Sequence, residues 1–143
     1  MRQIKFRAWD IKNNRMIYFD RIDFRCEYNC LEFGCDWNKY DFGYGDLQLD
    51  INDDPVMQFT GLQDKNGKDI YEGDIVEMRI RWAEYKGQDE DEMPVRYQKG
   101  RVVFDSGCFW IDSPLVSINC HFHYNNSDRE VIGNIYETPD VKD

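Results

Sequence analysis

Hydrophobic and polar residues alternate along several segments of the chain. The longest such run covers 76–82, where Val, Met, Ile and Trp alternate with one Glu and two Arg. Because successive side chains of a strand point to opposite faces, this pattern predicts a β-strand with one face packed inward and the other turned to water or a partner. Arg79 and Arg81 then share a strand face with Glu77. A similar alternation over 4–9 predicts a half-buried strand near the start of the chain.

Residues that favour turns separate the predicted strands. The segment 10–15 is rich in Asp and Asn, and the Asn-Gly pair at 66–67 supplies the positive-φ dipeptide of a tight hairpin after 56–61. Asp-Ser-Gly at 105–107 marks another hairpin. A glycine inside the last predicted strand, Gly133, indicates a bulge or a close backbone approach. At least six strands joined by short turns predict a mainly β fold, built as a small barrel or sandwich.

Evidence for helix is weak. Short helical turns fit 93–97 and 127–131, and neither segment carries a sustained apolar stripe with a period of 3.6 residues. Two polar or irregular segments, 26–52 and 83–98, are expected to form long loops on the β scaffold. The most charged part, 86–92, has too little apolar surface to bury and is expected to be mobile.

No linker clearly divides the chain. We therefore expect a single domain over 1–143, which can be subdivided into an N-terminal β subdomain over 1–55 and a barrel over 56–137. The composition supports the β assignment, because 12 Ile, 8 Val and 22 aromatic residues stand against 5 Leu and 2 Ala. β-branched and aromatic side chains favour strands, whereas Ala and Leu favour helices.

The composition also predicts where the protein works. Apolar residues make up 41% of the 143 residues, which is enough for a core, and the net charge is −10. No stretch approaches the roughly 18 consecutive apolar residues of a membrane span, and the first residues lack the apolar centre of an export signal. We expect a soluble protein that stays in the cytoplasm and does not bind a membrane.

Three segments resemble the YopX family of bacteriophage and prophage proteins. They are 4–10, the long run from Met57 through the Asn-Gly turn to Val76, and 130–137. The resemblance implies a phage-encoded, mainly β protein with short helical turns, an SH3-like barrel in its C-terminal half, and a place in the cytoplasm of the bacterial host. It implies no catalytic residues, because the family has no assigned biochemical activity.

The cysteines are the first candidates for chemistry. Their odd number, five, and the lack of an export signal favour reduced thiols. Cys26, Cys30 and Cys35 offer three thiolates, and Cys120 or His121 a fourth ligand for tetrahedral zinc. The spacing departs from the paired Cys-x2-Cys pattern of strong zinc sites. Buried or incidental thiols are therefore the favoured interpretation.

Two histidines form a second metal candidate. His121 and His123 bracket Phe122 and would lie on one face of a strand, where two imidazoles can reach one metal ion. A third ligand is needed, and the sequence does not identify one. Two half-exposed histidines on a solvated face are the favoured alternative, and we expect no cofactor.

Catalytic motifs are missing from the sequence. It contains no Gly-x-Ser-x-Gly elbow, no phosphate-binding loop and no dinucleotide fingerprint. We therefore expect a protein that is not an enzyme, with a metal-dependent enzyme as the third alternative. Nucleic-acid binding ranks second: Arg79 and Arg81 near aromatic residues favour it, whereas a net charge of −10 opposes binding to a polyanion unless cations gather on one face.

A protein-interaction module is the favoured function. Asp89, Glu90, Asp91 and Glu92 form an acidic run that would steer a basic partner, although such charge also serves solubility. Trp37 and Tyr40 belong to an aromatic-rich segment that suits an interface, or equally a second small core. We expect a host or phage protein as the partner. Self-association through strand edges also stays open.

Overall fold

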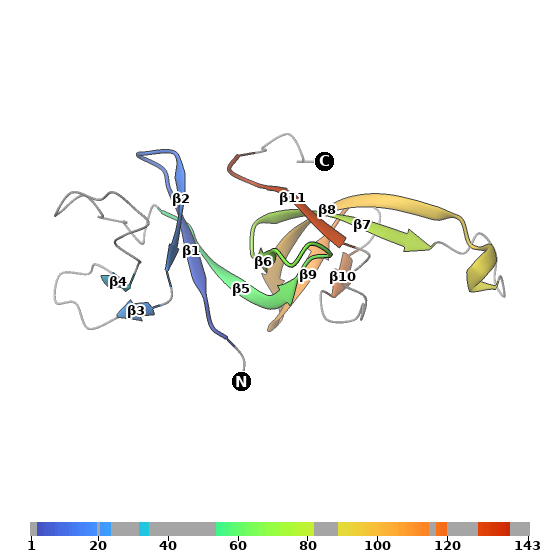
Figure 1. Ribbon diagram of the computed structural model, residues 1–143, viewed down its shortest axis with the longest axis horizontal. Helices are drawn as coiled ribbons and strands as arrows, with labels where there is room; N and C mark the ends of the chain where they lie inside the picture. Colours follow the sequence, from blue (N-terminus) through green and yellow to red (C-terminus); the bar gives the residue numbers. More distant parts are fainter. Residues whose placement is uncertain are drawn as a thin grey trace. The chain divides into compact units, whose positions relative to one another are not determined.

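In the computed structural model the chain is built from antiparallel β-strands (Figure 1). The structure describes residues 3–19, 21–23, 32–34, 54–81, 89–114, 117–119 and 129–137. Its strands are β1 (Phe6–Asp10), β2 (Arg15–Phe19), β3 (Arg21–Asp23), β4 (Glu32–Gly34), β5 (Val56–Gln63), β6 (Asp69–Tyr71), β7 (Asp74–Arg81), β8 (Val95–Asp105), β9 (Cys108–Asp112), β10 (Ser117–Asn119) and β11 (Arg129–Asn134). The mainly β fold, of the small barrel or sandwich class, is confirmed. No α-helix occurs in the described residues, where η1 (Glu90–Glu92) is a 3₁₀ turn.

The chain divides into two compact units, Met1–Phe59 and Thr60–Asp143. In the first unit β1 pairs with β2 as the predicted hairpin, and on its other side with the first half of β5. Asn14, in the turn between β1 and β2, has the positive φ of 53° that Asn tolerates better than most residues. β3 and β4 form a separate two-stranded sheet. Among the described residues of this unit, the buried apolar side chains are Ala8, Trp9, Ile17, Phe19, Met57 and Phe59.

The second unit contains a five-stranded sheet in the order β10-β9-β8-β7-β11. Neighbouring strands are antiparallel, and β8 at the centre has an unbroken register with both β7 and β9. The register of β11 against β7 shifts between Val131 and Gly133, which fits a bulge next to the glycine, one of the two alternatives that the sequence offered. A cluster of buried side chains forms the core: Ile70, Val76, Met78, Val102, Phe109, Ile111 and Val131.

Turn chemistry explains the two hairpins of this unit. Ser106 and Gly107 connect β8 to β9 and both have positive φ, 50° and 81°. Positive φ at both central residues defines the mirror-image turn whose twist matches that of paired strands. In the hairpin between β5 and β6, Gly67 has a φ of 79°, whereas the prediction of positive φ at Asn66 is wrong. There Asp64 forms the turn through its side chain.

Three further local predictions are wrong. The 3₁₀ turn ends at Glu92, and β8 begins at Val95 where the sequence suggested a helical turn over 93–97. The end of the proposed loop 83–98 is therefore strand. The described part of 127–131 belongs to β11. In each case pairing with β7 in the five-stranded sheet, which the local sequence does not reveal, makes the segment a strand.

Candidate interaction surface

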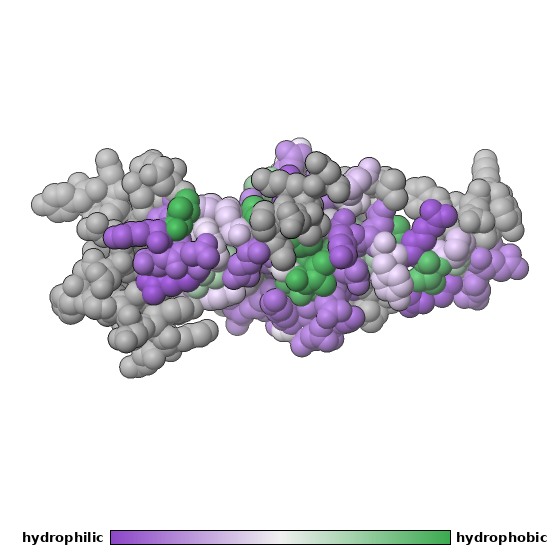
Figure 2. All heavy atoms as spheres, turned by 90° about the horizontal axis from the view of Figure 1, so that it is seen from above, coloured by the Kyte–Doolittle hydropathy of each residue, from purple (hydrophilic) through white to green (hydrophobic). Residues whose placement is uncertain are grey.

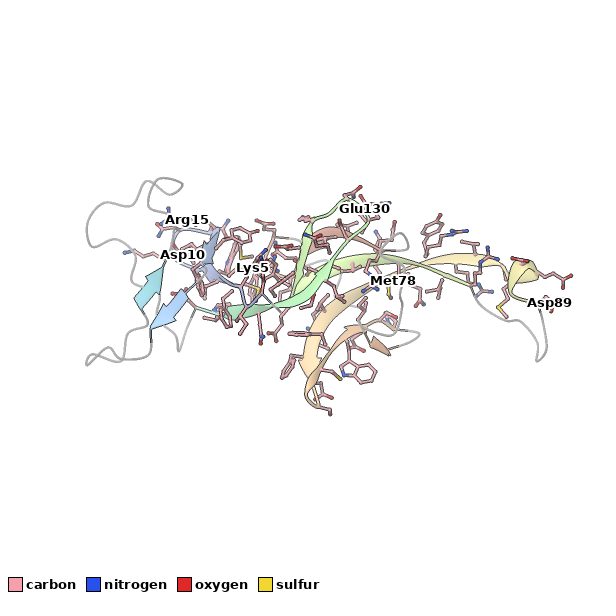
Figure 3. All side chains as sticks on the ribbon, turned by 60° about the horizontal axis from the view of Figure 1, so that its bottom comes forward. Lys5, Asp10, Arg15, Met78, Asp89 and Glu130 are labelled. Carbon is pink, nitrogen blue, oxygen red and sulfur yellow. The ribbon has the colours of Figure 1, made fainter. Side chains whose placement is uncertain are left out.

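β7 and β8 continue beyond the sheet as a two-stranded ribbon. Among the described residues, β11 pairs with β7 as far as Met78, and β9 pairs with β8 as far as Arg101. β7 and β8 still pair with each other out to Arg81 and Val95. Figure 3 shows Met78 near the sheet and Asp89 at the far end of the ribbon. A ribbon of this kind presents side chains away from the core, where a partner can reach them.

One face of β7 and β8, along the ribbon and the part of the sheet next to it, gathers cations around an aromatic ring. Residues that pair across antiparallel strands share a face, and Arg79 lies opposite Tyr97. Arg81 lies on the same side of β7, as the alternation predicts, and Lys99 and Arg101 follow Tyr97 on the same side of β8. All four cations are exposed, and 67% of the Tyr97 surface is accessible to solvent. We call this set of five residues the basic face: Arg79, Arg81, Tyr97, Lys99 and Arg101.

Carboxylates also lie within and beside the basic face, where the ribbon joins the sheet. Glu77 lies opposite Lys99 on β8 and opposite Glu130 on β11. Lys65 forms an ion pair with Glu130. The hydrogen bond to Glu130, strengthened by the charges of Glu130 and Glu77, raises the pKa of Lys65 above its usual value. The sheet end of the face is therefore a mixed-charge region rather than a continuation of the cationic surface.

Carboxylates also occupy the far end of the ribbon. Asp89, Asp91 and Glu92 are exposed, and the backbone N–H of Glu92 donates to the carbonyl of Asp89 at 3.0 Å. With Glu90 they form a run of four acidic residues in the sequence shortly before β8. We call Asp89–Glu92 the acidic turn. The ribbon thus carries positive charge on one face and negative charge at its far end.

The chemistry of the basic face favours binding. A guanidinium stays protonated in proteins and donates hydrogen bonds without accepting any, so it binds anions and does not act as a base. An exposed tyrosine ring supplies contact area and a surface for stacking. On the face shown in Figure 2, hydrophilic colours dominate the described part and apolar colours appear in separate patches. The described groups suit recognition of a charged partner.

The buried carboxylate of Asp64 has a structural role. Its Oδ1 accepts hydrogen bonds from the backbone N–H groups of Asn66 and Lys68 at 2.8 and 2.9 Å, and its Oδ2 accepts one from Val131 at 3.0 Å. Burial alone would raise the pKa of Asp64, but the bonds from Val131, Lys68 and Asn66 outweigh it and lower the pKa below its usual value. Asp64 therefore connects the β5–β6 hairpin to β11.

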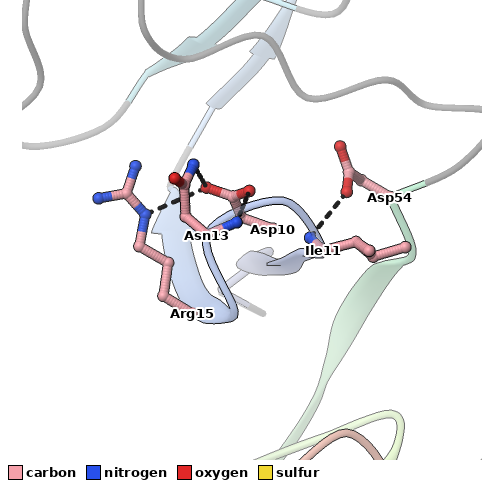
Figure 4. Close-up of polar contacts among 5 residues, drawn as sticks. All are labelled: Asp10, Ile11, Asn13, Arg15 and Asp54. Carbon is pink, nitrogen blue, oxygen red and sulfur yellow. Dashed lines mark hydrogen bonds and ion pairs between the residues drawn. The ribbon is translucent and has the colours of Figure 1, made fainter.

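Asp10 plays a similar part in the first unit (Figure 4). Its carboxylate accepts hydrogen bonds from the backbone N–H and the side-chain amide of Asn13, at 3.0 and 2.8 Å, and from Nε of Arg15 at 3.1 Å. Burial raises the pKa of Asp10, but these bonds and the charge of Arg15 lower it by more. The backbone N–H of Ile11 donates to Asp54 at 3.0 Å. These contacts fix the turn between β1 and β2.

Several candidate residues from the sequence lie outside the described residues: Cys26, Cys30, Cys35, Cys120, His121, His123, Trp37 and Tyr40. Within the described part of the chain, no group of three or more His, Cys, Asp or Glu residues is arranged to hold a metal ion. Cys108, at the start of β9, is a free, partly buried thiol whose Sγ lies 3.7 Å from the carbonyl oxygen of Asp105. No helix in the described residues is long and apolar enough to cross a membrane.

Sequence reasoning missed three members of the basic face. All three belong to β8: Tyr97 lies in the segment 83–98 that was assigned to a loop, and Lys99 and Arg101 follow that segment. The signal was present, because these residues occupy every second position of the segment. It was obscured by the exposure of both faces of the ribbon, which removes the usual contrast between apolar and polar positions.

The fold and the exposed ribbon define an antiparallel β protein with a charged, exposed surface. Comparison with protein families matches residues 5–141 to the model described as YopX protein. The chain belongs to this family, which confirms the resemblance seen in the sequence. The family and its structural neighbours have no characterised function.

Two solved structures resemble this chain in fold. The crystal structure of YopX from Bacillus subtilis has 20% sequence identity and a TM-score of 0.56, and the match covers 100% of both chains. The crystal structure of protein EF1440 from Enterococcus faecalis has 22% identity and a TM-score of 0.50, with 98% of each chain covered. A comparison with curated proteins finds no match. At such identities the likeness concerns the fold alone.

Proposed function

We propose that the protein is a phage or prophage accessory protein that acts by binding another protein of phage or host in the bacterial cytoplasm, without chemistry of its own. Membership of the YopX family supports the phage origin. We also propose that the second unit follows the plan of an SH3-like barrel, since its antiparallel strands are joined by short hairpins. Such a scaffold holds binding residues on protruding elements.

The observation that carries the binding proposal is the ribbon. Arg79, Arg81 and Tyr97 are exposed on one face, beyond the strands that cover β7 and β8 in the sheet. Arginine and tyrosine are enriched among the residues that dominate binding energy at protein interfaces. The charges of the ribbon also provide a physical basis for steering a partner, because oppositely charged surfaces accelerate encounter.

A capture experiment with matched variants tests this function. The tagged protein is expressed in cells in which the prophage has been induced, and bound proteins are identified by mass spectrometry. We expect a specific partner to be retained by the wild type and lost by R79A/R81A/Y97A. The control K12A/K68A removes two exposed cations elsewhere and is expected to retain the partner. Equal capture by all three proteins, or none by the wild type, contradicts the proposal.

Nucleic-acid binding is the second candidate function. Four cations around an exposed tyrosine favour it, since positive surfaces with stacking rings bind single strands. Glu77 within the face, the acidic turn at the far end of the ribbon and the net charge of −10 oppose it. A mobility shift with single- and double-stranded probes at low salt decides the matter. A shift that R79A/R81A abolishes would favour nucleic acid, and no shift removes this candidate.

A further inference from the structure

The turn between β5 and β6, residues 64–68, holds the only Asn-Gly pair of the sequence, Asn66 and Gly67. Asparagine is a chemically labile residue, and a glycine after it leaves the next backbone nitrogen open to reaction, because glycine has no Cβ to shield it. Both residues are exposed, and a Cβ added at Gly67 would meet no heavy atom within 4 Å. Water therefore has access to both groups, and the conformation of the turn decides whether they react.

The folded turn keeps the Gly67 nitrogen away from the Asn66 side chain. The Gly67 N–H donates to the carbonyl of Asp64 at 3.0 Å, which closes a β-turn. Neither of the central residues, Lys65 and Asn66, has a positive φ, which indicates a type I turn with a ψ of about 0° at the second of them. Attack on the side chain needs a different ψ, one that turns the following nitrogen toward Cβ.

Hydrogen bonds and charge restrain both reacting groups. The Gly67 nitrogen must lose its proton before it can attack, and its bond to the Asp64 carbonyl opposes that loss. Asn66 donates from Nδ2 to Oε1 of Glu130 at 3.3 Å, and from its backbone N–H to Oδ1 of Asp64 at 2.8 Å. The two carboxylates also disfavour a second negative charge on the nitrogen between them. Asp64 thus restrains Asn66 through its carboxylate and Gly67 through its carbonyl.

We infer that Asn66 is a site of spontaneous deamidation and that opening of the β5–β6 turn controls the rate. In the open turn, water takes the proton of the Gly67 nitrogen, the nitrogen attacks Cγ of Asn66, and a new C–N bond closes a cyclic imide. The side-chain nitrogen takes up a proton and leaves as ammonia. A water molecule then opens the imide at either carbonyl, and position 66 becomes aspartate or isoaspartate. This inference goes beyond the proposed function, because it concerns a change in the chain itself.

The reaction weakens the connection between the turn and β11. A carboxylate at position 66 cannot donate to Glu130 and repels it instead. Isoaspartate lengthens the backbone by one carbon, which displaces the N–H groups of the turn that donate to Asp64. Because Asp64 also accepts a hydrogen bond from Val131, the change reaches β11. Refolding does not reverse it, since the amide nitrogen has left the chain.

Peptide mapping by mass spectrometry tests the inference on the full chain. The wild type is kept at mildly alkaline pH, either folded or unfolded in guanidinium chloride, with salt added to match the ionic strength. Conversion of Asn66 is followed over time in the chymotryptic peptide that contains it. We expect conversion to be at least about tenfold slower in the folded protein, because several hydrogen bonds must break before the turn opens. Equal rates in the two states, or no conversion in the unfolded chain, overturn the inference.

Two variants separate opening of the turn from unfolding of the whole chain. D64N removes the carboxylate that restrains the turn, and G100A crowds the middle of β8, where the added Cβ would lie 2.6 Å from Cγ2 of Ile111. We expect Asn66 to convert at least about threefold faster in folded D64N than in the folded wild type, and at equal rates in the two unfolded chains. G100A is the control and is expected to convert like the wild type.

The outcomes distinguish local from global control. No acceleration in folded D64N would mean that the Asp64 carboxylate does not hold the turn closed, and this overturns the inference. Faster conversion in G100A than in the wild type would mean that unfolding of the whole chain controls the reaction. That result also overturns the inference, and it is decisive even if D64N does not fold.

Discussion

The Asp64 carboxylate stabilises the second unit through three backbone hydrogen bonds from two distant segments. Asn66 and Lys68 belong to the turn before β6, and Val131 belongs to β11. A charged acceptor forms stronger hydrogen bonds than a neutral one, and a buried N–H left without a partner costs free energy. The Asp-x-Asn-Gly part of the family-like segment is thus explained by folding rather than by catalysis.

Replacing Asp64 should destabilise the protein. We expect D64N to lower the free energy of unfolding by about 2–4 kcal/mol, because the amide has one acceptor oxygen and turns N–H groups toward the remaining donors. Urea unfolding monitored by tryptophan fluorescence measures this loss. D112N, at an exposed carboxylate, is the control and is expected to change stability by less than about 0.5 kcal/mol. Equal stability of the two variants would contradict the role assigned to Asp64.

The same carboxylate predicts a pH dependence. The pKa of Asp64 is lower in the folded protein than the usual value of 3.8, so the unfolded chain takes up this proton first as pH falls. The stabilisation is fully present above about pH 4 and is lost as pH decreases through the folded pKa. We expect D64N, whose side chain does not titrate, to lose less stability than the wild type between about pH 4 and pH 2.5. Parallel stability profiles of the two proteins would show that Asp64 does not contribute.

Gly100 is a second residue with a specific physical requirement. It lies in the middle of β8, and an added Cβ would be 2.6 Å from Cγ2 of Ile111 and 2.9 Å from the backbone oxygen of Asp112. Because a backbone atom cannot move aside easily, we expect G100A to destabilise the protein by about 1–3 kcal/mol. Thermal unfolding followed by circular dichroism measures the effect. K99A, one residue away on the exposed face, is the control, and a loss of the same size there would show that strand propensity is responsible.

At the scale of elements, the sequence predicted strands best where their two faces differ. The alternation in β1 and β7 and the turn residues before β9 led to correct strands and hairpins. The first residues of β8 were missed because Val95, Arg96 and Tyr97 are all exposed, so no buried face reveals the period. Tertiary pairing with β7 defines this strand, and a single sequence does not display pairing. The basic face depends on that pairing and was therefore only half predicted, through Arg79 and Arg81.

The ribbon should be less stable locally than the sheet from which it extends. Ile80 and Arg96 lie in a part of β7 and β8 that has two strands, whereas Val76 and Val102 are buried in the five-stranded sheet. Two-stranded hairpins are marginally stable in water, and local opening requires less free energy where few apolar contacts are lost. We expect amide hydrogens of Ile80 and Arg96 to exchange at least 100-fold faster than that of Val102. Similar exchange rates, measured by NMR in dilute protein, would indicate that the ribbon is supported along its length.

At the scale of the whole molecule, charge imbalance should influence stability. The chain has 28 acidic and 18 basic residues, and its isoelectric point is about 4.6. At pH 7 repulsive pairs of charges outnumber attractive ones, and this repulsion acts over about 30 Å at 0.01 M salt but over about 8 Å at 0.15 M. Ion pairs such as that of Lys65 and Glu130 are weakened by the same salt, but exposed pairs contribute less than about 1 kcal/mol each.

We therefore expect the melting temperature at pH 7 to rise by a few degrees when salt increases from about 0.01 to 0.15 M. Near pH 4.6 the net charge vanishes, repulsion no longer dominates, and the same salt step should leave the melting temperature unchanged or lower it. The measurement is made with the wild type at about 1 µM, so that self-association, which would itself stabilise the folded chain, does not contribute. A melting temperature that falls with salt at pH 7 would mean that specific ion pairs outweigh the general repulsion, and that charge on this protein mainly stabilises its fold.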